Sequence, residues 1–270
     1  MHLRLRVLAS GSSGNAALVT ARSNGNRHDL LIDLGVSPRA VRGHLSAEGI
    51  DFESLHGVLL THGDTDHLHV GWARGWPSML APPVILRPEH GSILARAGLP
   101  NASTRWISNP LHVGPFQVRG CAVPHDTEGS TAFRIDWEGH SIGWATDLGH
   151  VPPQLLDLLE GVHVLAIESN YDRQMQMESP RPQVLKDRIM SGAGHLSNTQ
   201  ALEVATSLHE RGTTPNQFVL LHLSQQCNSP ERVRALWSDR APHLAPSMQI
   251  ACRRTPSHPI DCMAKVATLP

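Results

Sequence analysis

The feature that most constrains this chain is a dense run of imidazole and carboxylate side chains directly after an apolar segment. Residues 55–60 are mostly apolar and predict a buried strand, and the sequence THGDTDH occupies residues 61–67 at its C-terminal end. A short loop at a strand end can turn alternate side chains toward one point, and imidazole with carboxylate suits zinc, manganese or iron(II). A solvated polar loop explains any one of these side chains, but the set of four predicts a metal site: His62, Asp64, Asp66 and His67.

Length and composition set only broad limits. The chain has 270 residues, which fits one αβ domain, and we expect residues 1–270 to form a single domain. Histidine is abundant, at 18 residues, which favours further metal ligands along the chain. Because the formal net charge is −1 and no run of basic residues stands out, composition neither requires nor excludes nucleic acid as a partner.

Cysteine usage and the N-terminus indicate where the protein works. The four cysteines are widely spaced without a CxxC pair, which argues against a structural zinc site and against a disulfide framework. The first residues alternate arginine with apolar side chains and lack the apolar core of a signal peptide, and no stretch reaches membrane-spanning length. We therefore expect a cytoplasmic protein with no membrane partner.

The periodicity of apolar residues predicts strands followed by a helix, and this order occurs twice along the chain. Strands are expected over residues 3–7, 16–20, 28–33, 55–60, 116–123, 131–135, 141–146, 162–167 and 218–221, the last of these closing the core. A hairpin turn is expected at residues 23–26. Helices are expected over residues 38–44, 89–97 and 153–160, from a capping box at Ser197 and Gln200 to Gly212, and from Ser229 onward. Strands followed by a helix, twice over, predict a layered sandwich with the helices outside.

The metal loop resembles the HxHxDH signature of the metallo-β-lactamase superfamily. His62, Asp66 and His67 are in register with it, and Asp64 stands where a second histidine is usual. Residues 121–126, 145–149 and 220–224 are similar to the later segments of this superfamily, which carry its third histidine, its bridging aspartate and its final histidine. These segments supply His125, Asp147 and His222, each after an apolar or β-rich run. The resemblance implies an α/β fold, the four-layer αβ/βα metallo-β-lactamase sandwich.

Within the superfamily the chain most closely resembles the YycJ/WalJ-like exonuclease branch. The matching segments are residues 8–15, 31–35, 61–67, 168–172, 194–198 and 222–228. The Gly-His-Leu-Ser element at residues 194–197, a helix and then Leu-Leu-His-Leu-Ser at residues 220–224 are also similar to tRNase Z, in which the first of these histidines assists phosphodiester cleavage. Both relatives cut phosphodiesters, so the resemblance implies this reaction.

The resemblance also implies roles for the candidate site residues. One divalent ion would be bound by His62, Asp64 and His125, a second by Asp66, His67 and His222, and Asp147 would bridge them. A hydroxide held by the two ions would attack phosphorus, with Asp66 orienting the attacking water and His195 protonating the leaving oxygen. Manganese or zinc is the expected metal and magnesium is a further candidate, because a carboxylate at position 64 is a harder, more negative ligand than imidazole.

Substrate contacts are expected from four polar residues of the matching segments: Ser12, Asn15, Asn170 and Asn198. The serine-rich run at residues 10–15 is interpreted either as a tight turn or as a loop whose amides face phosphate. Residues 168–172 form either an ordinary strand-end loop or a part of the substrate side of the site, and His195 is either a helix-entry residue or a functional one.

Three functions fit the sequence. We rank first a metal-dependent phosphodiester hydrolase that acts on nucleic acid as a 5′-directed DNA exonuclease, with DNA favoured over RNA. A small-molecule metallohydrolase, such as a cyclic-phosphate phosphodiesterase, ranks second. A catalytically silent binding protein ranks third, because the other ligand positions are all filled.

Overall fold

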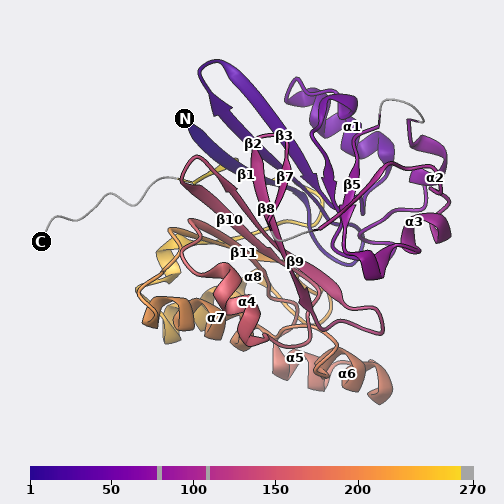
Figure 1. Ribbon diagram of the computed structural model, residues 1–270. Coiled ribbons are helices and arrows are strands. Elements are labelled where there is room, and N and C mark those ends of the chain that lie inside the picture. The colour runs from indigo at the N-terminus through magenta and orange to yellow at the C-terminus, as the bar shows by residue number, and fades with distance from the viewer. Residues whose placement is uncertain (78–80, 108–109, 263–270) are drawn as a thin grey trace, which may run out of the picture.

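The strands form two sheets that face each other. The computed structural model describes residues 1–77, 81–107 and 110–262. In this part of the chain each sheet has seven strands, in the orders β14-β1-β2-β3-β4-β5-β6 and β13-β12-β11-β10-β9-β8-β7 (Figure 1). The first sheet contains β1 His2–Ala9, β2 Ala16–Ser23, β3 Asn26–Ile32, β4 Val58–Leu59, β5 Val84–Leu86, β6 Thr104–Trp106 and β14 Ile260–Asp261. The second contains β7 Leu111–Val113, β8 Phe116–Val123, β9 Ser130–Trp137, β10 His140–Ala145, β11 Val164–Glu168, β12 Gln217–Leu221 and β13 Met248–Ile250.

Helices cover the outer face of each sheet. On the first sheet these are α1 Pro38–Ala47, α2 Trp72–Gly75 and α3 Ile93–Arg96, and on the second they are α4 Pro153–Leu159, α7 Asn198–Glu210 and α8 Pro230–Arg240 (Figure 1). Two further helices, α5 Arg173–Glu178 and α6 Gln183–Met190, lie at one end of the sandwich. Short 3₁₀ turns occupy Phe52–Ser54, Pro88–His90 and Ala245–Ser247.

Three buried apolar clusters correspond to the three interfaces between layers. One joins the facing sides of the two sheets and includes Val19, Phe133 and Trp144. A second lies between the first sheet and its helices, and a third lies between the second sheet and its helices. The order helix, sheet, sheet, helix confirms the predicted four-layer sandwich.

Two local predictions are confirmed in detail. Asn24 and Gly25 link β2 to β3 with φ of 50° and 80°, the positive values that a two-residue hairpin loop needs to match the strand twist. At the start of α7 the Ser197 hydroxyl accepts from the Gln200 amide at 3.3 Å, and the Gln200 side chain accepts from the Ser197 amide at 2.9 Å. This is the capping box expected from the sequence.

Two predicted elements were wrong in extent. The strand expected over residues 55–60 is only Val58–Leu59, because the next amide available to β3, that of Thr61, donates to the Asp33 carboxylate at 2.8 Å instead of to a backbone carbonyl. The helix expected over residues 89–97 is a 3₁₀ turn and a four-residue helix, with Gly91, a poor helix former, between them.

The strand at residues 218–221 does not close its sheet. β13 adds a parallel strand beyond β12, with Phe218 paired to Met248 and Leu220 paired to Ile250. Three residues carry too little periodicity for a strand to be predicted from sequence. No helix in the described ranges is long and apolar enough to cross a membrane.

Candidate metal centre

The loop at residues 61–67 is fixed by close backbone packing. The Asp66 carbonyl accepts from the Asn15 amide at 2.7 Å, and the Asp64 carbonyl accepts from the His67 amide at 2.8 Å. Gly35 lies so near that a Cβ added to it would fall 1.7 Å from the Asp66 carbonyl oxygen. The loop can therefore approach the first sheet only because residue 35 has no side chain.

Three polar residues leave core strands through an unusual backbone conformation. Asp33 follows β3, Asp147 follows β10 and His222 follows β12, with φ of 60°, 55° and 57°. Positive φ is uncommon for residues other than glycine and persists where the surrounding structure holds it, typically at functional sites. In each case the turn takes a side chain off the strand ladder and directs it into the same buried cluster.

Four histidines of the cluster are each held through Nδ1. His67 donates from Nδ1 to Asp33 Oδ2 at 2.7 Å, and His125 donates to the Gly194 carbonyl at 2.9 Å. His222 donates from Nδ1 to Glu168 Oε1 at 3.0 Å. The Nδ1 of His62 lies 3.0 Å from the Thr61 hydroxyl. Such partners fix the tautomer and orientation of metal-binding imidazoles and leave Nε2 as the ligand atom.

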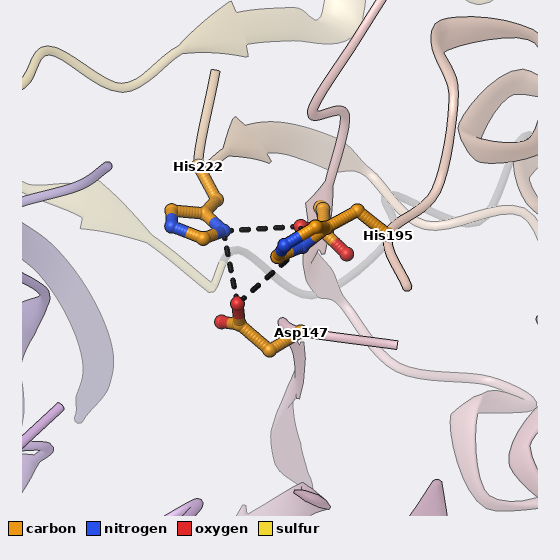
Figure 2. A group of neighbouring side chains, drawn as sticks. Asp147, His195 and His222 are labelled. Carbon is orange, nitrogen blue, oxygen red and sulfur yellow. Dashed lines mark hydrogen bonds and ion pairs between the residues drawn. The ribbon is translucent and has the colours of Figure 1, made fainter. Parts of the chain in front are cut away.

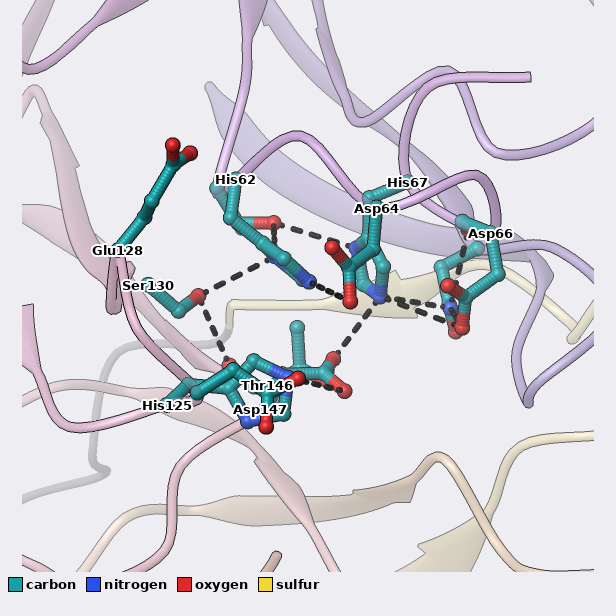
Figure 3. A network of polar contacts seen from close by, with 12 residues as sticks. His62, Asp64, Asp66, His67, His125, Glu128, Ser130, Thr146 and Asp147 are labelled. Carbon is teal, nitrogen blue, oxygen red and sulfur yellow. Dashed lines mark hydrogen bonds and ion pairs between the residues drawn. The ribbon is translucent and has the colours of Figure 1, made fainter. Parts of the chain in front are cut away.

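The inward-facing nitrogens are the best evidence that the site is built for a cation. Nε2 of His62 and Nε2 of His222 are buried and have no hydrogen-bond partner among the described residues. A buried polar atom without a partner is costly, so its presence indicates a ligand. Figure 3 shows the His62 and His67 rings together with Asp64, Asp66 and Asp147 around one small space.

The potential ligand atoms fall into groups that match the set implied by the sequence resemblance. His62, Asp64 and His125 form one group, Asp66, His67 and His222 form another, and the ligand atoms within each lie within 4.8 Å of one another. Asp147 reaches both groups, because its Oδ2 lies 2.9 Å from His67 Nε2 in the second group and its Oδ1 lies 3.9 Å from His125 Nε2 in the first. The structure thus brings all seven candidate ligands together.

The buried Glu168 and the half-buried His195 form a pair beside this cluster. Glu168 is fully buried, and its Oε1 accepts from His195 Nδ1 at 2.7 Å, while Oε2 accepts from the amides of Leu148 and Leu196. Figure 2 shows His195 and His222 directed toward Asp147. Burial disfavours the charge of Glu168, but the neighbouring His195 outweighs it and holds the pKa of the carboxyl below its ordinary value. Burial likewise opposes protonation of His195, yet Glu168 and Asp147 raise the pKa of the imidazole. A further potential cation group consists of Asp147, Glu168, His195 and His222. The Glu168 carboxylate already accepts four hydrogen bonds, two at each oxygen, which makes it a poor ligand.

A cavity of about 350 Å³ opens beside the cluster. Ser12 and Asn170, two of the expected substrate contacts, line it together with His195. Asn15 is outside the lining, because its amide is buried behind the metal loop, 2.9 Å from His67 Nε2 and bonded to the Gly11 amide.

Asn198 also lies away from the cavity, contrary to the role expected of it. Its side chain is buried, accepts from the Ser169 hydroxyl at 2.7 Å and donates to Asn228 Oδ1 at 2.9 Å. These bonds tie the start of α7 to the end of β11 and to the segment before α8, so Asn198 helps to position the strand that carries Glu168.

Sequence comparison adds a decisive observation, since residues 28–223 match the beta-lactamase superfamily domain. The chain belongs to the metallo-β-lactamase superfamily. It is accordingly a hydrolase of the metallo-β-lactamase fold.

Curated members of the superfamily resemble the chain over most of its length. Exodeoxyribonuclease WalJ of Streptococcus pneumoniae is 27% identical over 238 residues, which is 83% of each chain. Exodeoxyribonuclease YycJ of Bacillus anthracis is 26% identical over 248 residues, which is 87% of each chain.

Solved structures of the superfamily share the fold at low identity. A diphosphatase from the PhnP family superposes with a TM-score of 0.66 at 15% identity, covering 97% of this chain and 98% of the other. The short form of human tRNase Z superposes with a TM-score of 0.59 at 15% identity, covering 94% and 98%. Both likenesses support the architecture described above.

Sequence reasoning missed two carboxylates of this metallo-β-lactamase site. Asp33 was placed only in a matching segment, and Glu168 was left open as a strand-end residue. Asp33 directly follows an apolar strand and Glu168 ends one, and this position was the available signal. Their partners are distant in the sequence: His67 lies 34 residues after Asp33, and His195 lies 27 residues after Glu168.

Replacing Asp33 with asparagine should weaken metal binding although Asp33 is not a ligand. The Asp33→Asn variant keeps an acceptor for His67 but removes the charge that makes its imidazole a better donor to a cation. We expect zinc affinity to fall by about 10- to 100-fold, the usual effect of losing such a partner, in competition titrations with a chelating dye. Asp29→Asn is the control, because Asp29 is also buried on β3 but bonds only Thr20 and Arg27. Equal affinities in wild type and Asp33→Asn would contradict this role.

Proposed function

We propose that this hydrolase cleaves phosphodiesters in nucleic acid as a 5′-directed DNA exonuclease, with two divalent cations in its site. The observation that carries the proposal is the pair of three-ligand groups on either side of Asp147, placed beside a cavity that His195 also lines. Two such cations polarise phosphoryl oxygens and lower the pKa of a water molecule, which is the chemistry that phosphodiester hydrolysis requires.

The identity of the bound cations depends on the ligand group formed by His62, Asp64 and His125. His62 and His125 supply imidazole, and Asp64 supplies a carboxylate whose side chain is 54% exposed. Mixed imidazole and carboxylate ligands suit manganese or zinc, which are the proposed ions. The carboxylate adds negative charge and a harder ligand, which shifts the preference toward manganese, or toward magnesium as a further candidate, relative to zinc.

The protein's own residues would supply proton transfer and orientation. Asp66 lines the cavity with Oδ2 3.4 Å from His222 Nε2, where its free carboxylate oxygen can accept a proton from the attacking water. His195 is oriented by Glu168 through Nδ1, which leaves its Nε2 as the atom that can donate a proton to the leaving oxygen. Glu168 also contacts His222 and so links the proposed acid to the second metal group.

The names of the relatives favour DNA, because those that match over 83% and 87% of the chain are exodeoxyribonucleases. The cavity also offers the Ser12 hydroxyl and the Asn170 side-chain oxygen, which can contact a nucleotide of either kind. We place this activity in the cytoplasm, consistent with free thiols at all four cysteines.

A small-molecule phosphodiesterase is the second candidate. The observation that favours it is the net charge of −1, since enzymes that follow duplex DNA ordinarily carry a basic groove.

A panel of substrates separates these candidates. Manganese-loaded protein is incubated with DNA labelled at either end, single- and double-stranded, with matching RNA, with a cyclic nucleotide and with bis(p-nitrophenyl) phosphate. We expect DNA to be degraded from its 5′ end faster than RNA, and no activity in an Asp147→Asn preparation, which controls for contaminating nuclease. Turnover of the cyclic nucleotide without degradation of DNA or RNA would contradict the proposal.

The His195→Ala variant should lose turnover but keep metal. If His195 is the leaving-group acid, DNA hydrolysis falls by about 10²- to 10⁴-fold, the usual range for a positioned general acid. The loss should shrink with bis(p-nitrophenyl) phosphate, because p-nitrophenolate needs little protonation. His209→Ala is a matched control, since His209 is exposed at the end of α7, its ring bonds Thr214 and contacts His243, and it does not line the metal cavity. Either of two outcomes would contradict the proposed role. Loss of metal from the His195→Ala variant would indicate that His195 is a metal ligand, and normal DNA turnover would indicate that it is only a helix-entry residue.

A further inference from the structure

Arg181 is an oriented cation at the edge of the metal cavity with only neutral partners. Its Nε donates to Gln226 Oε1 at 3.1 Å, and its two terminal nitrogens donate to Gln176 Oε1 and the Ser224 hydroxyl, each at 3.3 Å. No carboxylate of the described residues pairs with it. Arg188 lines the same cavity but donates from Nε to Asp126 at 3.0 Å in a salt bridge, so its charge is already offset.

A second oriented arginine lies in an adjacent cavity of about 490 Å³. Arg253 donates from Nε to the Ser13 hydroxyl at 2.6 Å, and its aliphatic stem lies against Gly11. It too has no carboxylate partner in the described ranges. Arg234 lines this cavity as well, and it lies on α8 three residues after Glu231.

Ser224 connects the two cavities. It lines both of them, and its hydroxyl accepts from Arg181. A chain of phosphates that leaves the metal cavity over Ser224 therefore meets Arg181 first and then enters the space lined by Arg253.

We propose that Arg181 and Arg253 bind the phosphates that flank the scissile one, so that the nucleic-acid strand runs from the metal cavity over Ser224 into the second cavity. This inference rests on the proposed function and specifies its substrate path. Arginine suits phosphate because its planar group offers several fixed donors, and hydrogen bonds to neutral groups orient those donors without cancelling the charge.

The proposed path explains how a chain with a net charge near zero can bind a polyanionic substrate. The metal cavity is itself acidic, with Asp64, Asp66 and Asp147 in its lining, so bound cations serve the scissile phosphate and leave little excess charge for its neighbours. Two unpaired arginines next to the cavity provide that attraction locally, without a basic surface. A cyclic nucleotide or chromogenic diester has no flanking phosphate, so the two arginines contribute less to its turnover than to that of DNA.

The salt dependence of DNA hydrolysis tests the path. For manganese-loaded enzyme, log kcat/KM on a single-stranded oligonucleotide is plotted against log [NaCl] for wild type, Arg181→Gln, Arg253→Gln and the double variant. Each lost phosphate contact should reduce the steepness of the slope by about 0.7, and the double variant by about 1.4. Anisotropy of a labelled oligonucleotide bound to metal-free full-length protein should give the same differences. Arg181→Lys should keep the slope but bind more weakly, because lysine retains the charge and loses the fork.

Arg211→Gln is the matched control, because it removes an exposed arginine that pairs with Asp157 and lines neither cavity. Its slope should equal that of wild type. Turnover of bis(p-nitrophenyl) phosphate should fall less than DNA turnover in the Arg181 variant. DNA hydrolysis with unchanged slopes in the folded Arg181 and Arg253 variants would overturn the path alone, whereas wild-type protein that neither binds nor cuts nucleic acid would overturn the path and the proposed function together.

Discussion

The buried contact between Asp33 and His67 is the constraint on which the rest of the site depends. Both side chains are fully buried, and the Asp33 carboxylate also accepts from the amide and hydroxyl of Thr61. One carboxylate thus ends the β3–β4 ladder, fixes the start of the metal loop and turns the His67 imidazole so that Nε2 faces Asp147. The same arrangement, with Nδ1 bonded to the protein and Nε2 directed inward, recurs at His125 and His222.

Convergence of this kind is costly in an empty site. Asp64, Asp66 and Asp147 line one cavity, two buried imidazole nitrogens have no hydrogen-bond partner among the described residues, and three strand ends adopt positive φ. The apolar clusters on both faces of each sheet hold these residues in place despite the cost. A cation that binds only the folded chain offsets part of this cost, because it stabilises the folded state by about 2.7 kcal/mol when present at a hundred times its dissociation constant.

Local sequence patterns indicated the hairpin, the capping box and a metal site in the dense His/Asp loop, because these features are visible within a few neighbouring residues. The four-layer fold and the further candidate ligands His125, Asp147 and His222 followed only from the resemblance to the metallo-β-lactamase superfamily. Features that depend on distant partners were not predictable in this way. Asn198 was assigned to substrate, but its amide bonds Ser169 and Asn228, 29 and 30 residues away, and is unavailable. The position of Arg181 at the cavity was not predicted, because its partner Ser224 is 43 residues distant in the sequence. The short strand β13 was not predicted either, because it forms through its pairing with β12.

The central claim is that the inward-facing nitrogens and Asp147 hold two cations. The most direct test is the metal content of full-length protein reconstituted with manganese or zinc and freed of excess ion, with folding checked by circular dichroism. The account predicts about two ions per chain, and about one in both His62→Ala and His222→Ala, since each removes a ligand from a different group. A folded wild-type chain that retains neither metal would contradict it.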